Sequence, residues 1–399
     1  MTSIRDKRVL LGVAGGVAAF KSAELVRLLV KAGANVRVVM TEAATRFITP
    51  VTMQALSGQT VYTDLWDPRV ADNMGHIELS RDRELIVVAP ASADFMAKVA
   101  LGLADDLLSS LALARRCPLI LAPAMNVEMW DNPATRRNVL ALRDDGVLIA
   151  GPGAGDQACG ETGMGRMLEA AELFEQVESL FQPKVLAGKR VLVTAGPTEE
   201  PIDPVRVITN SSSGKMGYSV ARAAHEAGAE VTLVSGPVAL QAPTGVARID
   251  VRSADDMFEA VKAAAGGCDI FIAVAAVADY KVKNAVKQKI KKGDGRSMAL
   301  ELEQNRDILS YVASLAKPPF CVGFAAESEN LAANAKAKRA KKKVPLLAAN
   351  LAQDAIGADE NAVTLFDDLG EHPLGRGPKI EVARKLVLHI AGMLAGKKR

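Results

Sequence analysis

Two series of short apolar segments run along the chain, and each series alternates with amphipathic stretches of helical length. In the first half the apolar runs are residues 9–13, 36–40, 85–89, 119–121 and 147–149. In the second half they are residues 191–194, 231–234, 270–275, 320–324 and 346–349. Apolar runs without polar alternation are typical of strands buried on both faces of a parallel sheet. The pattern therefore predicts two α/β domains, each with a parallel sheet covered by helices.

Both series open in the same way, with a short apolar strand, a glycine turn and an amphipathic helix. The first opening reads Arg-Val-Leu-Leu-Gly-Val-Ala-Gly-Gly over residues 8–16, and the second reads Arg-Val-Leu-Val-Thr-Ala-Gly over residues 190–196. The N-terminus of such a helix offers unpaired N–H groups and a partial positive charge to a phosphate. We therefore expect two Rossmann-like, nucleotide-handling domains, residues 1–181 and 189–399, joined by a linker over residues 182–188.

Composition limits the class of protein. The chain has 399 residues, of which 49% are hydrophobic and 24% are charged, so each domain can bury a core. A net charge of +3 is too small to indicate a nucleic-acid surface. The four cysteines show no CxxC spacing, and no apolar stretch reaches the ~20 residues of a membrane helix. We expect a cytoplasmic enzyme with reduced thiols and with neither a nucleic-acid nor a membrane partner.

Three side chains in the first half are candidates for catalysis, and each also has a purely structural interpretation. Asn126 follows the apolar run 119–121 at the carboxyl edge of the predicted sheet, where ligands bind in open α/β folds, or it caps a helix. His76 leaves a loop and is placed to act as a general base, or it is a structural histidine. Cys159 lies among six glycines in residues 151–165. That segment is too flexible for a packed element and suits a flap carrying a proton donor, or the thiol has no chemical role.

These side chains stand in motifs that resemble those of the flavin-dependent cysteine decarboxylases. The motifs are the Gly15-Gly16 turn, Gly75-His76-Ile77-Glu78, Ala122-Pro123-Ala124-Met125-Asn126 and Gln157-Ala158-Cys159-Gly160. The resemblance implies a flavodoxin-like domain with FMN at the strand ends and the FMN phosphate over the glycine turn. It implies that His76 is the base, that Asn126 orients the substrate carboxylate and amide, and that Cys159 returns a proton to an enethiolate. The FMN contacts implied by position are Gly15, Gly16, Thr41, Ala89, Ser92 and Met125, and Ala14 stands where the family usually has Ser or Thr.

The second half carries polar and basic segments suited to a nucleoside triphosphate. Residues 210–215 read Asn-Ser-Ser-Ser-Gly-Lys, which fails the P-loop pattern and predicts either a polar helix N-terminus that meets a phosphate or a surface turn. Asp279 follows a buried strand, where an acid holds Mg²⁺ on a triphosphate, contacts a nucleotide base or caps a helix. Lys289 lies in a basic run, and Lys338 and Lys342 are one helical turn apart, although such runs also form solvated faces.

These segments resemble the phosphopantothenate–cysteine ligase domain. The motifs that carry the resemblance are Ala195-Gly196-Pro197-Thr198, residues 210–217, residues 276–280, Lys289-Ile290-Lys291-Lys292 and residues 323–327. The resemblance implies that CTP activates 4′-phosphopantothenate as an acyl-cytidylate, which cysteine converts to the amide. It implies that Asn210 stabilises this intermediate, that Lys289 binds the triphosphate and that Asp279 binds Mg²⁺. The CTP contacts implied by position are Ala275, Ala276, Asp279, Arg306, Asp307, Ile308, Leu309, Phe324, Lys338 and Lys342, and Arg306 stands where the family has proline.

Together the two halves resemble the bifunctional coenzyme A biosynthesis enzymes over nearly the whole chain. The resemblance implies that the first domain decarboxylates the product of the second, 4′-phosphopantothenoylcysteine, to 4′-phosphopantetheine. It also implies a homo-oligomer, a dodecamer built from trimers of the flavin domain and dimers of the ligase domain. Two alternatives are a nicotinamide-dependent oxidoreductase, which needs a GxGxxG turn that this chain lacks, and a flavin-binding regulatory protein. Both alternatives leave the second half unexplained.

Overall fold

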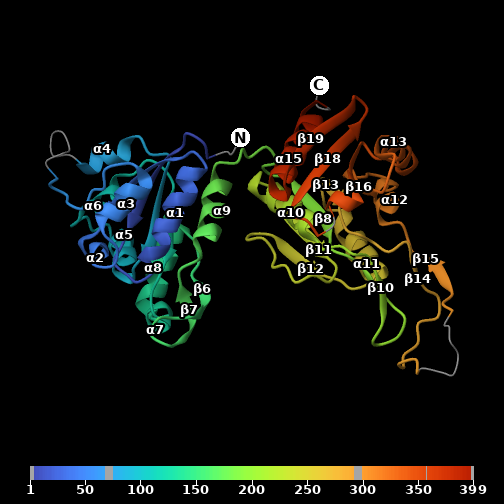
Figure 1. Cartoon of the computed structure of the whole chain (residues 1–399), viewed down its shortest axis with the longest axis horizontal. Helices are drawn as coiled ribbons and strands as arrows, with labels where there is room; N and C mark the ends of the chain where they lie inside the picture. Colours follow the sequence, from blue (N-terminus) through green and yellow to red (C-terminus); the bar gives the residue numbers. More distant parts are fainter. Residues whose placement is uncertain (1–3, 68–74, 292–298, 356, 397–399) are drawn as a thin grey trace. The chain divides into compact units, whose positions relative to one another are not determined.

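In a computed structural model, the chain divides into two compact units, Met1–Gln182 and Pro183–Arg399 (Figure 1). The structure describes residues 4–67, 75–291, 299–355 and 357–396. Each unit has its own sheet with a hydrophobic core on either face. Residues 183–188 belong to the second unit, because Leu186 is 1% exposed and lies in one of its two cores.

The first unit is built on a five-stranded parallel sheet with the strand order β2-β1-β3-β4-β5. Its strands are β1 (Arg8–Val13), β2 (Asn35–Met40), β3 (Leu85–Ala91), β4 (Leu119–Pro123) and β5 (Leu148–Ile149). Each strand overlaps one of the apolar runs of the first half. This is the flavodoxin-like order, in which ligands bind at the carboxyl ends of β1 and β3, where the direction of winding reverses. The prediction of a flavodoxin-like domain is confirmed.

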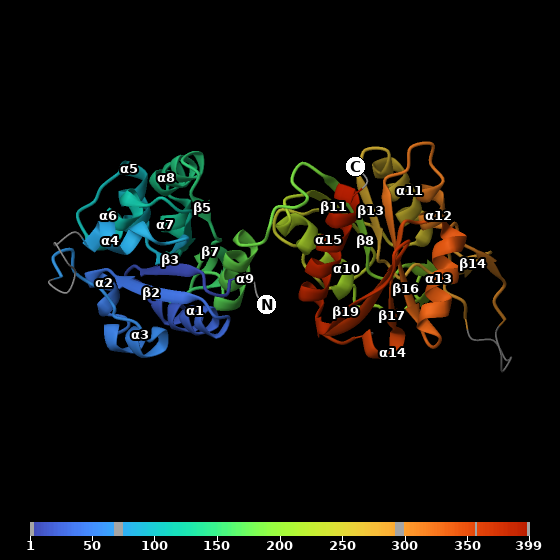
Figure 2. The same cartoon turned by 90° about the horizontal axis from the view of Figure 1, so that it is seen from above.

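Helices cover both faces of this sheet (Figure 2). On one core lie α1 (Ala19–Lys31), α3 (Pro50–Ser57) and α9 (Ala170–Leu180). On the other lie α4 (Gly75–Arg81), α5 (Ala93–Leu101), α6 (Leu107–Ala114) and α8 (Pro133–Asp144). Two short helices, α2 (Glu42–Thr45) and α7 (Val127–Asp131), follow β2 and β4. Both short helices therefore begin at the carboxyl edge of the sheet, where the candidate flavin residues were expected.

The glycine-rich segment after β5 forms an antiparallel hairpin of β6 (Gly153–Asp156) and β7 (Thr162–Arg166). The prediction of a segment too flexible to pack is therefore wrong. At Gly165, where φ is +136°, a Cβ would lie 2.4 Å from the carbonyl oxygen of Met125. At Gly163 a Cβ would lie 2.7 Å from the side chain of Val127. The glycines are needed because the hairpin packs closely against the turn between β4 and α7.

The second unit has an eight-stranded sheet with the order β12-β11-β8-β13-β16-β17-β18-β19. The strands are β8 (Arg190–Ala195), β11 (Glu230–Ser235), β12 (Ala247–Asp250), β13 (Ile270–Ala273), β16 (Phe320–Glu327), β17 (Leu346–Leu351), β18 (Glu360–Asp367) and β19 (Gly370–Pro378). The strands from β12 to β17 are parallel, and β18 and β19 are antiparallel to their neighbours. The parallel part follows the Rossmann order 3-2-1-4-5-6 when its strands are counted along the chain, which confirms the Rossmann-like prediction.

Helices cover both faces of this sheet as well. On one face lie α10 (Lys215–Glu226) and α15 (Lys379–Gly396), and on the other lie α11 (Ala254–Ala265), α12 (Ile308–Ala313) and α13 (Leu331–Lys342). A short helix, α14 (Ala352–Ala355), follows β17. Among the described residues of either unit, none of the helices combines the length and the apolar character needed to cross a bilayer.

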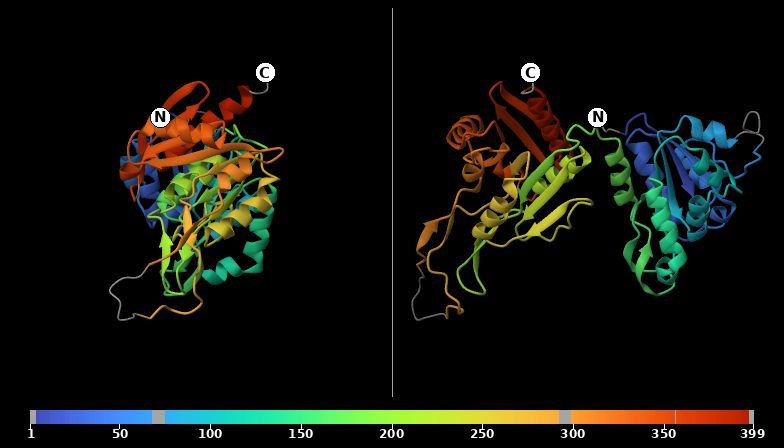
Figure 3. Two further views of the ribbon diagram at one scale, coloured as in Figure 1. Left: turned by 90° about the vertical axis from the view of Figure 1, so that its right-hand side faces the viewer. Right: turned by 180° about the vertical axis from the view of Figure 1, so that it is seen from behind.

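Two small strand pairs extend from the loops of the second unit (Figure 3). One pairs β9 (Glu199–Pro201) with β10 (Val207–Thr209), and the other pairs β14 (Tyr280–Val282) with β15 (Leu302–Gln304). The strand predicted over residues 270–275 is shorter than expected, because β13 ends at Ala273, so Asp279 lies six residues beyond the strand. Between Ala273 and Asp279, Ala276 forms a single bridge with Pro197.

Candidate active sites

The turn Ala14-Gly15-Gly16 follows β1 at the point where the strand order of the first unit reverses. Its start is fixed by a hydrogen bond of 3.1 Å from the Ala14 N–H to the carbonyl oxygen of Pro90. A Cβ on Gly15 would lie 2.5 Å from that of Ala43, so only glycine fits beside α2. Within the described part of the chain, the N–H groups of Gly15 and Gly16 have no acceptor, and α1 has no side-chain cap. These unpaired donors are suited to a bound anion.

The other predicted flavin contacts differ in how they are placed. Thr41 caps α2 and Ser92 caps α5, and each hydroxyl accepts a backbone N–H at 3.2 Å. Both residues therefore lie at strand ends on the same edge as the glycine turn. Ala89 is fully buried within β3, and its carbonyl accepts a hydrogen bond from the Ser22 hydroxyl. The structure thus brings Gly15, Gly16, Thr41, Ser92 and Met125 to one edge and places Ala89 inside the sheet.

Asn126 uses the two ends of its amide for two different purposes. Its Oδ1 accepts the N–H of Glu128 at 2.8 Å and so caps α7, as the structural interpretation predicts. Its Nδ2 lies 3.6 Å from the Sγ of Cys159, which is exposed in the turn of the β6–β7 hairpin. The structure therefore brings together two of the three residues predicted to act in the first unit. The donor face of the amide is the one that points toward the thiol.

Two further residues complete this cluster: Glu161, which no sequence motif included, and Gln157, which belongs to the Cys159 motif but was given no role of its own. The Glu161 carboxylate accepts a hydrogen bond from the Asn126 amide and lies 3.6 Å from the Cys159 sulfur. The Gln157 side chain accepts the Val127 N–H at 3.1 Å and donates to the Met164 carbonyl at 3.2 Å. Gln157 thus ties the tip of the hairpin to the start of α7. In the sequence, their position could have indicated these two residues, because each lies two positions from Cys159.

His76 lies in the first turn of α4, but its side chain falls outside the described residues. Its predicted role as a base therefore stays a prediction.

A buried lysine connects the glycine turn to the hairpin. Lys21, in α1, is 5% exposed and donates to the Met167 carbonyl and to the Glu169 carboxylate, both at 2.9 Å. The hydrogen bond from Lys21 lowers the pKa of Glu169 below its ordinary value, so this carboxylate is ionised near neutral pH. Since α1 follows the glycine turn and Met167 follows β7, this contact couples the two parts of the first site.

In the second unit, the turn after β8 is bound to the segment after β13. Thr198 is fully buried, and its hydroxyl accepts the Ala278 N–H at 3.0 Å. The Asn210 amide donates to the Ala276 carbonyl at 2.9 Å, so Asn210 lies at this same edge. A Cβ on Gly236 would lie 1.7 Å from the carbonyl oxygen of Pro197, which shows how closely the β11 loop approaches.

The N-terminus of α10 lies at the same edge of the sheet. This helix begins at Lys215, as predicted, and its N-cap is Gly214 at φ +75° with no side-chain cap. A Cβ on Gly217 would lie 2.5 Å from that of Ala195, so the first turn of α10 packs directly on the end of β8. A twelve-residue helix that starts here without a side-chain cap presents its positive end to the strand edge.

Asp279 is exposed and lies beside the segment that leads into α12. Its carbonyl accepts the Asn305 N–H at 2.8 Å, and the Asn305 amide donates to the Ala278 carbonyl at 2.9 Å. Of the described residues, no group of three or more potential metal ligands includes Asp279. Mg²⁺ at this carboxylate would take its other ligands from phosphate and water, as this ion commonly does.

Lys289 is exposed in a loop that is anchored at the next residue. The Ile290 N–H donates to the carboxylate of Asp203 at 3.1 Å, and its carbonyl accepts from Arg206 at 2.6 Å. Asp203 is 2% exposed. Burial would raise the pKa of Asp203, but backbone hydrogen bonds from Val205, Ile290 and Arg206 hold that pKa below its ordinary value. A fixed carboxylate therefore positions the chain next to Lys289.

Arg306 points toward α11. Its guanidinium pairs with Asp255 at 2.8 Å and with Glu259 at 2.7 Å, and it lies 3.8 Å above the centre of the Phe258 ring. Ile308 is buried in the core beneath α12. Any contact of these two residues with a nucleotide would therefore use their backbone. Leu309 packs toward Gly323, where a Cβ would lie 2.8 Å from the leucine side chain.

Asp307 and Lys342 form an ion pair, which joins two of the residues predicted to contact CTP. Burial would raise the pKa of Asp307, but hydrogen bonds from Lys342 and Ser310 outweigh it and hold that pKa below its ordinary value. Lys338 lies on the same helix, 4.0 Å from the Glu327 carboxylate at the end of β16. Phe324 is half-buried on that strand.

Comparison with known proteins places both units in described families. Residues 1–182 match the family model described as flavoprotein, and residues 186–394 match the model of the DNA/pantothenate metabolism flavoprotein C-terminal domain. The chain is 49% identical over 395 residues to the Coenzyme A biosynthesis bifunctional protein CoaBC of Vibrio cholerae, covering 98% of this chain and 99% of that protein. The chain belongs to this family of bifunctional coenzyme A biosynthesis proteins. The protein of the same name from Escherichia coli is 46% identical over 379 residues, with 93% of both chains covered.

Among solved structures, the C-terminal domain of Coenzyme A biosynthesis bifunctional protein CoaBC is 41% identical, with a TM-score of 0.47, covering 53% of this chain and 99% of that chain. The two family models divide the predicted site residues between them. Gly15 through Cys159 lie inside the flavoprotein match, and Asn210 through Lys342 lie inside the C-terminal domain match. Membership in the family of bifunctional coenzyme A biosynthesis proteins accounts for both halves of the chain, which neither alternative does.

Proposed function

We propose that the two units catalyse consecutive steps of coenzyme A biosynthesis. The second unit joins 4′-phosphopantothenate to cysteine with activation by CTP, and the first unit decarboxylates the product to 4′-phosphopantetheine. The observation that carries this proposal is the cluster of Asn126, Cys159 and Glu161, held by the β6–β7 hairpin within the flavoprotein-matched unit. A protein that only binds flavin has no need of a thiol and an amide held together in this way.

FMN fits the carboxyl edge of the first unit. The unpaired N–H groups of Gly15 and Gly16, together with the uncapped start of α1, suit its phosphate. Ala14 has no hydroxyl, so this contact depends on backbone donors. When bound, the flavin supplies reversible hydride acceptance next to the substrate thiol. Thr41, Ser92 and Met125 are the further residues that this proposal places around it.

Asn126 and Cys159 have separate tasks in the proposed decarboxylation. Because Oδ1 of Asn126 already accepts the Glu128 N–H, we assign substrate binding to its Nδ2, where a substrate carboxylate oxygen would replace Glu161 as the acceptor. Holding that carboxylate fixes the bond that breaks when CO₂ leaves. Cys159 then gives its thiol proton to the enethiolate and recovers a proton from solvent. Glu161 contacts both side chains and so positions the donor relative to the carboxylate.

The proposed ligase site lies at the carboxyl edge of the second unit. The start of α10 and the exposed Lys289 suit the triphosphate of CTP, and Asp279 suits a Mg²⁺ ion shared with its phosphates. Asn210 keeps one N–H and its carbonyl oxygen for the acyl-cytidylate while the other N–H binds Ala276. Phe324, Asp307, Lys338 and Lys342 complete the proposed CTP contacts along β16 and α13.

The family resemblance also supports a cytoplasmic homo-oligomer, a dodecamer assembled from trimers of the first unit and dimers of the second. Light scattering on the purified full chain should give the mass of twelve chains. A monomer at micromolar concentration would contradict this part of the proposal.

A coupled assay tests the function. Purified protein reconstituted with FMN and given 4′-phosphopantothenate, cysteine, CTP and Mg²⁺ should release CO₂, and omission of CTP should abolish the release. Supplying 4′-phosphopantothenoylcysteine directly should restore CO₂ release without CTP. Release from the unligated substrates without CTP, or no release in the complete mixture, would refute the coupled scheme.

A further inference from the structure

A cluster of three residues in the second unit lies apart from the candidate ligase site. Asp367 ends β18, His372 lies on β19 and His389 lies on α15, three elements that are neighbours in Figure 1. Phe366, the residue before Asp367, pairs with Leu347 near the beginning of β17. Asp367 is therefore at the amino edge of the parallel strands, whereas Asn210 binds Ala276 at the carboxyl edge.

The carboxylate of Asp367 lies between two imidazole rings. Its Oδ1 is 2.9 Å from Nε2 of His372, and its Oδ2 is 2.9 Å from Nε2 of His389. One ligand atom from each residue lies within 4.8 Å of the other two. The Asp367 side chain is 1% exposed, whereas the histidine side chains are 34% and 22% exposed. The cluster is therefore anchored inside the protein and reaches solvent at its histidines.

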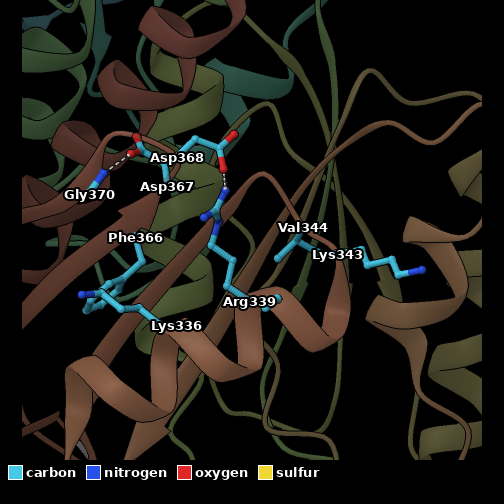
Figure 4. Close-up of a pocket in the computed structure, with 9 residues that line it drawn as sticks. Lys336, Arg339, Lys343, Val344, Phe366, Asp367, Asp368 and Gly370 are labelled. Carbon is cyan, nitrogen blue, oxygen red and sulfur yellow. Dashed lines mark hydrogen bonds and ion pairs between the residues drawn. The ribbon is translucent and has the colours of Figure 1, made fainter.

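The orientation of the carboxylate is fixed by the turn between β18 and β19. Oδ1 of Asp367 accepts the N–H of Leu369 at 2.8 Å and that of Gly370 at 3.1 Å, and Figure 4 shows the second of these bonds. The N–H groups of Leu369 and Gly370 thus fix the direction of this carboxylate, and second contacts of this kind orient metal ligands in proteins.

The basic side chains nearby are paired with other acids. Arg339 pairs with Asp368, as Figure 4 shows, and Lys336 pairs with Glu371 at 2.8 Å. Lys343 points away from Asp367 in the same view. In the part of the chain that the structure describes, the ion pairs of Asp367 are with the two histidines and with no lysine or arginine. No permanently charged cation among the described residues therefore competes with a metal ion for this carboxylate.

We propose that Asp367, His372 and His389 bind one divalent transition-metal ion of the Zn²⁺ type. Two imidazole nitrogens and one carboxylate oxygen are a familiar ligand set for this ion, with water in the fourth position. Ligand atoms around tetrahedral Zn²⁺ are about 3.3 Å apart, whereas the three ligand atoms here lie within 4.8 Å of one another, so binding requires them to draw together by no more than about 1.5 Å. The ion replaces the Nε2 protons between the rings and the carboxylate, and each ring then carries its proton on Nδ1. The bound ion links α15 to the β18–β19 hairpin.

Zinc titration of the full-length protein tests this site. Protein stripped with a chelator is titrated with Zn²⁺ in competition with a chromophoric zinc indicator. We compare the unmodified chain with His372→Gln, His389→Gln and the control Asp368→Asn, which removes the neighbouring acid outside the cluster. The unmodified chain and the control should each bind one equivalent, and each histidine variant should bind it at least about 100-fold more weakly. Circular dichroism and ligase activity of the variants report whether the second unit is folded.

The proposal is overturned if the unmodified chain binds no Zn²⁺. It is equally overturned if both histidine variants bind as tightly as the unmodified chain, because the ion is then held elsewhere. A rise of the thermal unfolding temperature with Zn²⁺ that is present in the control and lost in both folded histidine variants supports the site independently. Neither measurement depends on the flavin or on CTP.

Discussion

The amide nitrogen of Asn126 lies 3.6 Å from the sulfur of Cys159, although 33 residues separate the two in sequence. The contact depends on the glycines of the β6–β7 hairpin, since larger residues at Gly163 and Gly165 would collide with the turn that carries Asn126. Glycine-rich sequence here serves close packing. It brings a thiol next to an amide at the mouth of the first site.

Asn126→Asp separates the two functions of this side chain. Aspartate keeps an oxygen to cap α7 but replaces the Nδ2 donor with a carboxylate beside that of Glu161, so the free energy of unfolding should fall by about 1 kcal/mol. Decarboxylation of 4′-phosphopantothenoylcysteine should fall by about 100-fold, the usual effect of losing one aligned donor. Stopped-flow CO₂ release and urea unfolding measure the two effects.

The matched control is Asn132→Asp, because Asn132 caps α8 in the same way, with Oδ1 accepting the Ala134 N–H at 2.9 Å. The control should retain full activity, and its stability should exceed that of Asn126→Asp by the repulsion between the introduced carboxylate and that of Glu161. Equal activity of the two variants would rule out a substrate-binding role for Asn126.

Cys159→Ser should still release CO₂ but should fail to complete the reaction. A serine hydroxyl is a much weaker acid than a thiol, so formation of 4′-phosphopantetheine should fall by at least about 100-fold while the unsaturated thiol product accumulates. Mass spectrometry of the products measures both. Cys117→Ser is the control, since burial raises the pKa of the half-buried Cys117 thiol and it lies away from the hairpin. A normal yield from Cys159→Ser would exclude this thiol as the proton donor.

Gly165→Ala should disrupt the hairpin. The added Cβ meets the Met125 carbonyl and also strains a backbone with φ of +136°, so we expect a loss of about 2–3 kcal/mol and a large loss of decarboxylation. Gly160→Ala has a φ of +87° but meets nothing within 4 Å, so it should cost only about 1 kcal/mol. Urea unfolding followed by flavin fluorescence measures the difference. Equal effects would show that the close approach to Met125 is unimportant.

Asn210→Asp should impair amide formation and spare decarboxylation. The substitution removes the donor to the Ala276 carbonyl and places a negative charge where the acyl-cytidylate is expected. Pyrophosphate release and CO₂ release from added 4′-phosphopantothenoylcysteine measure the two halves separately. A parallel loss of both activities would indicate general misfolding and would remove the support for a specific role.

Asp307→Asn should make the second unit less sensitive to acid. The pKa of Asp307 is below its ordinary value in the folded chain, so its charge stabilises the fold above about pH 4, and this contribution is lost as the pH falls through the folded-state pKa. Because the side chain is 43% exposed, we expect less than about 1 kcal/mol at pH 7 and a smaller difference at pH 4. Asparagine preserves the cap of α12. Urea unfolding midpoints of the unmodified chain and of Asp307→Asn that differ by the same amount at pH 7 and at pH 4 would contradict this prediction.

The parallel strands could be predicted because their apolar runs reflect burial on both faces. Residues 346–349 indicate β17 for this reason, but β18, read as Glu-Asn-Ala-Val-Thr-Leu-Phe-Asp, mixes polar and apolar positions and was missed. The start of α10 could be predicted from its polar residues and glycine. The hairpin of β6 and β7 could not, because glycine propensity argues against strands and only the contact with Met125 explains it.

In the candidate sites too, single residues could be predicted from local sequence, whereas their contacts with one another could not. Asn126 and Cys159 were predicted as separate candidates, and only tertiary structure shows that Glu161 contacts both side chains. His372 and His389 are 5 and 22 residues from Asp367, spacings that match no metal motif. They meet because α15 packs against a hairpin that the sequence patterns did not indicate. Arg306 was expected at the nucleotide, but three contacts with α11 account for its side chain.

The burial of Leu186 decides how the two catalytic halves can be produced as separate polypeptides. Its N–H donates to the Ala227 carbonyl at 2.8 Å, and Lys184 donates to the Glu226 carbonyl at 2.7 Å. A truncated ligase that started at Lys189 would lose both contacts and leave a hole beneath α10. A truncation at the peptide bond between Gln182 and Pro183 keeps these contacts within the second unit.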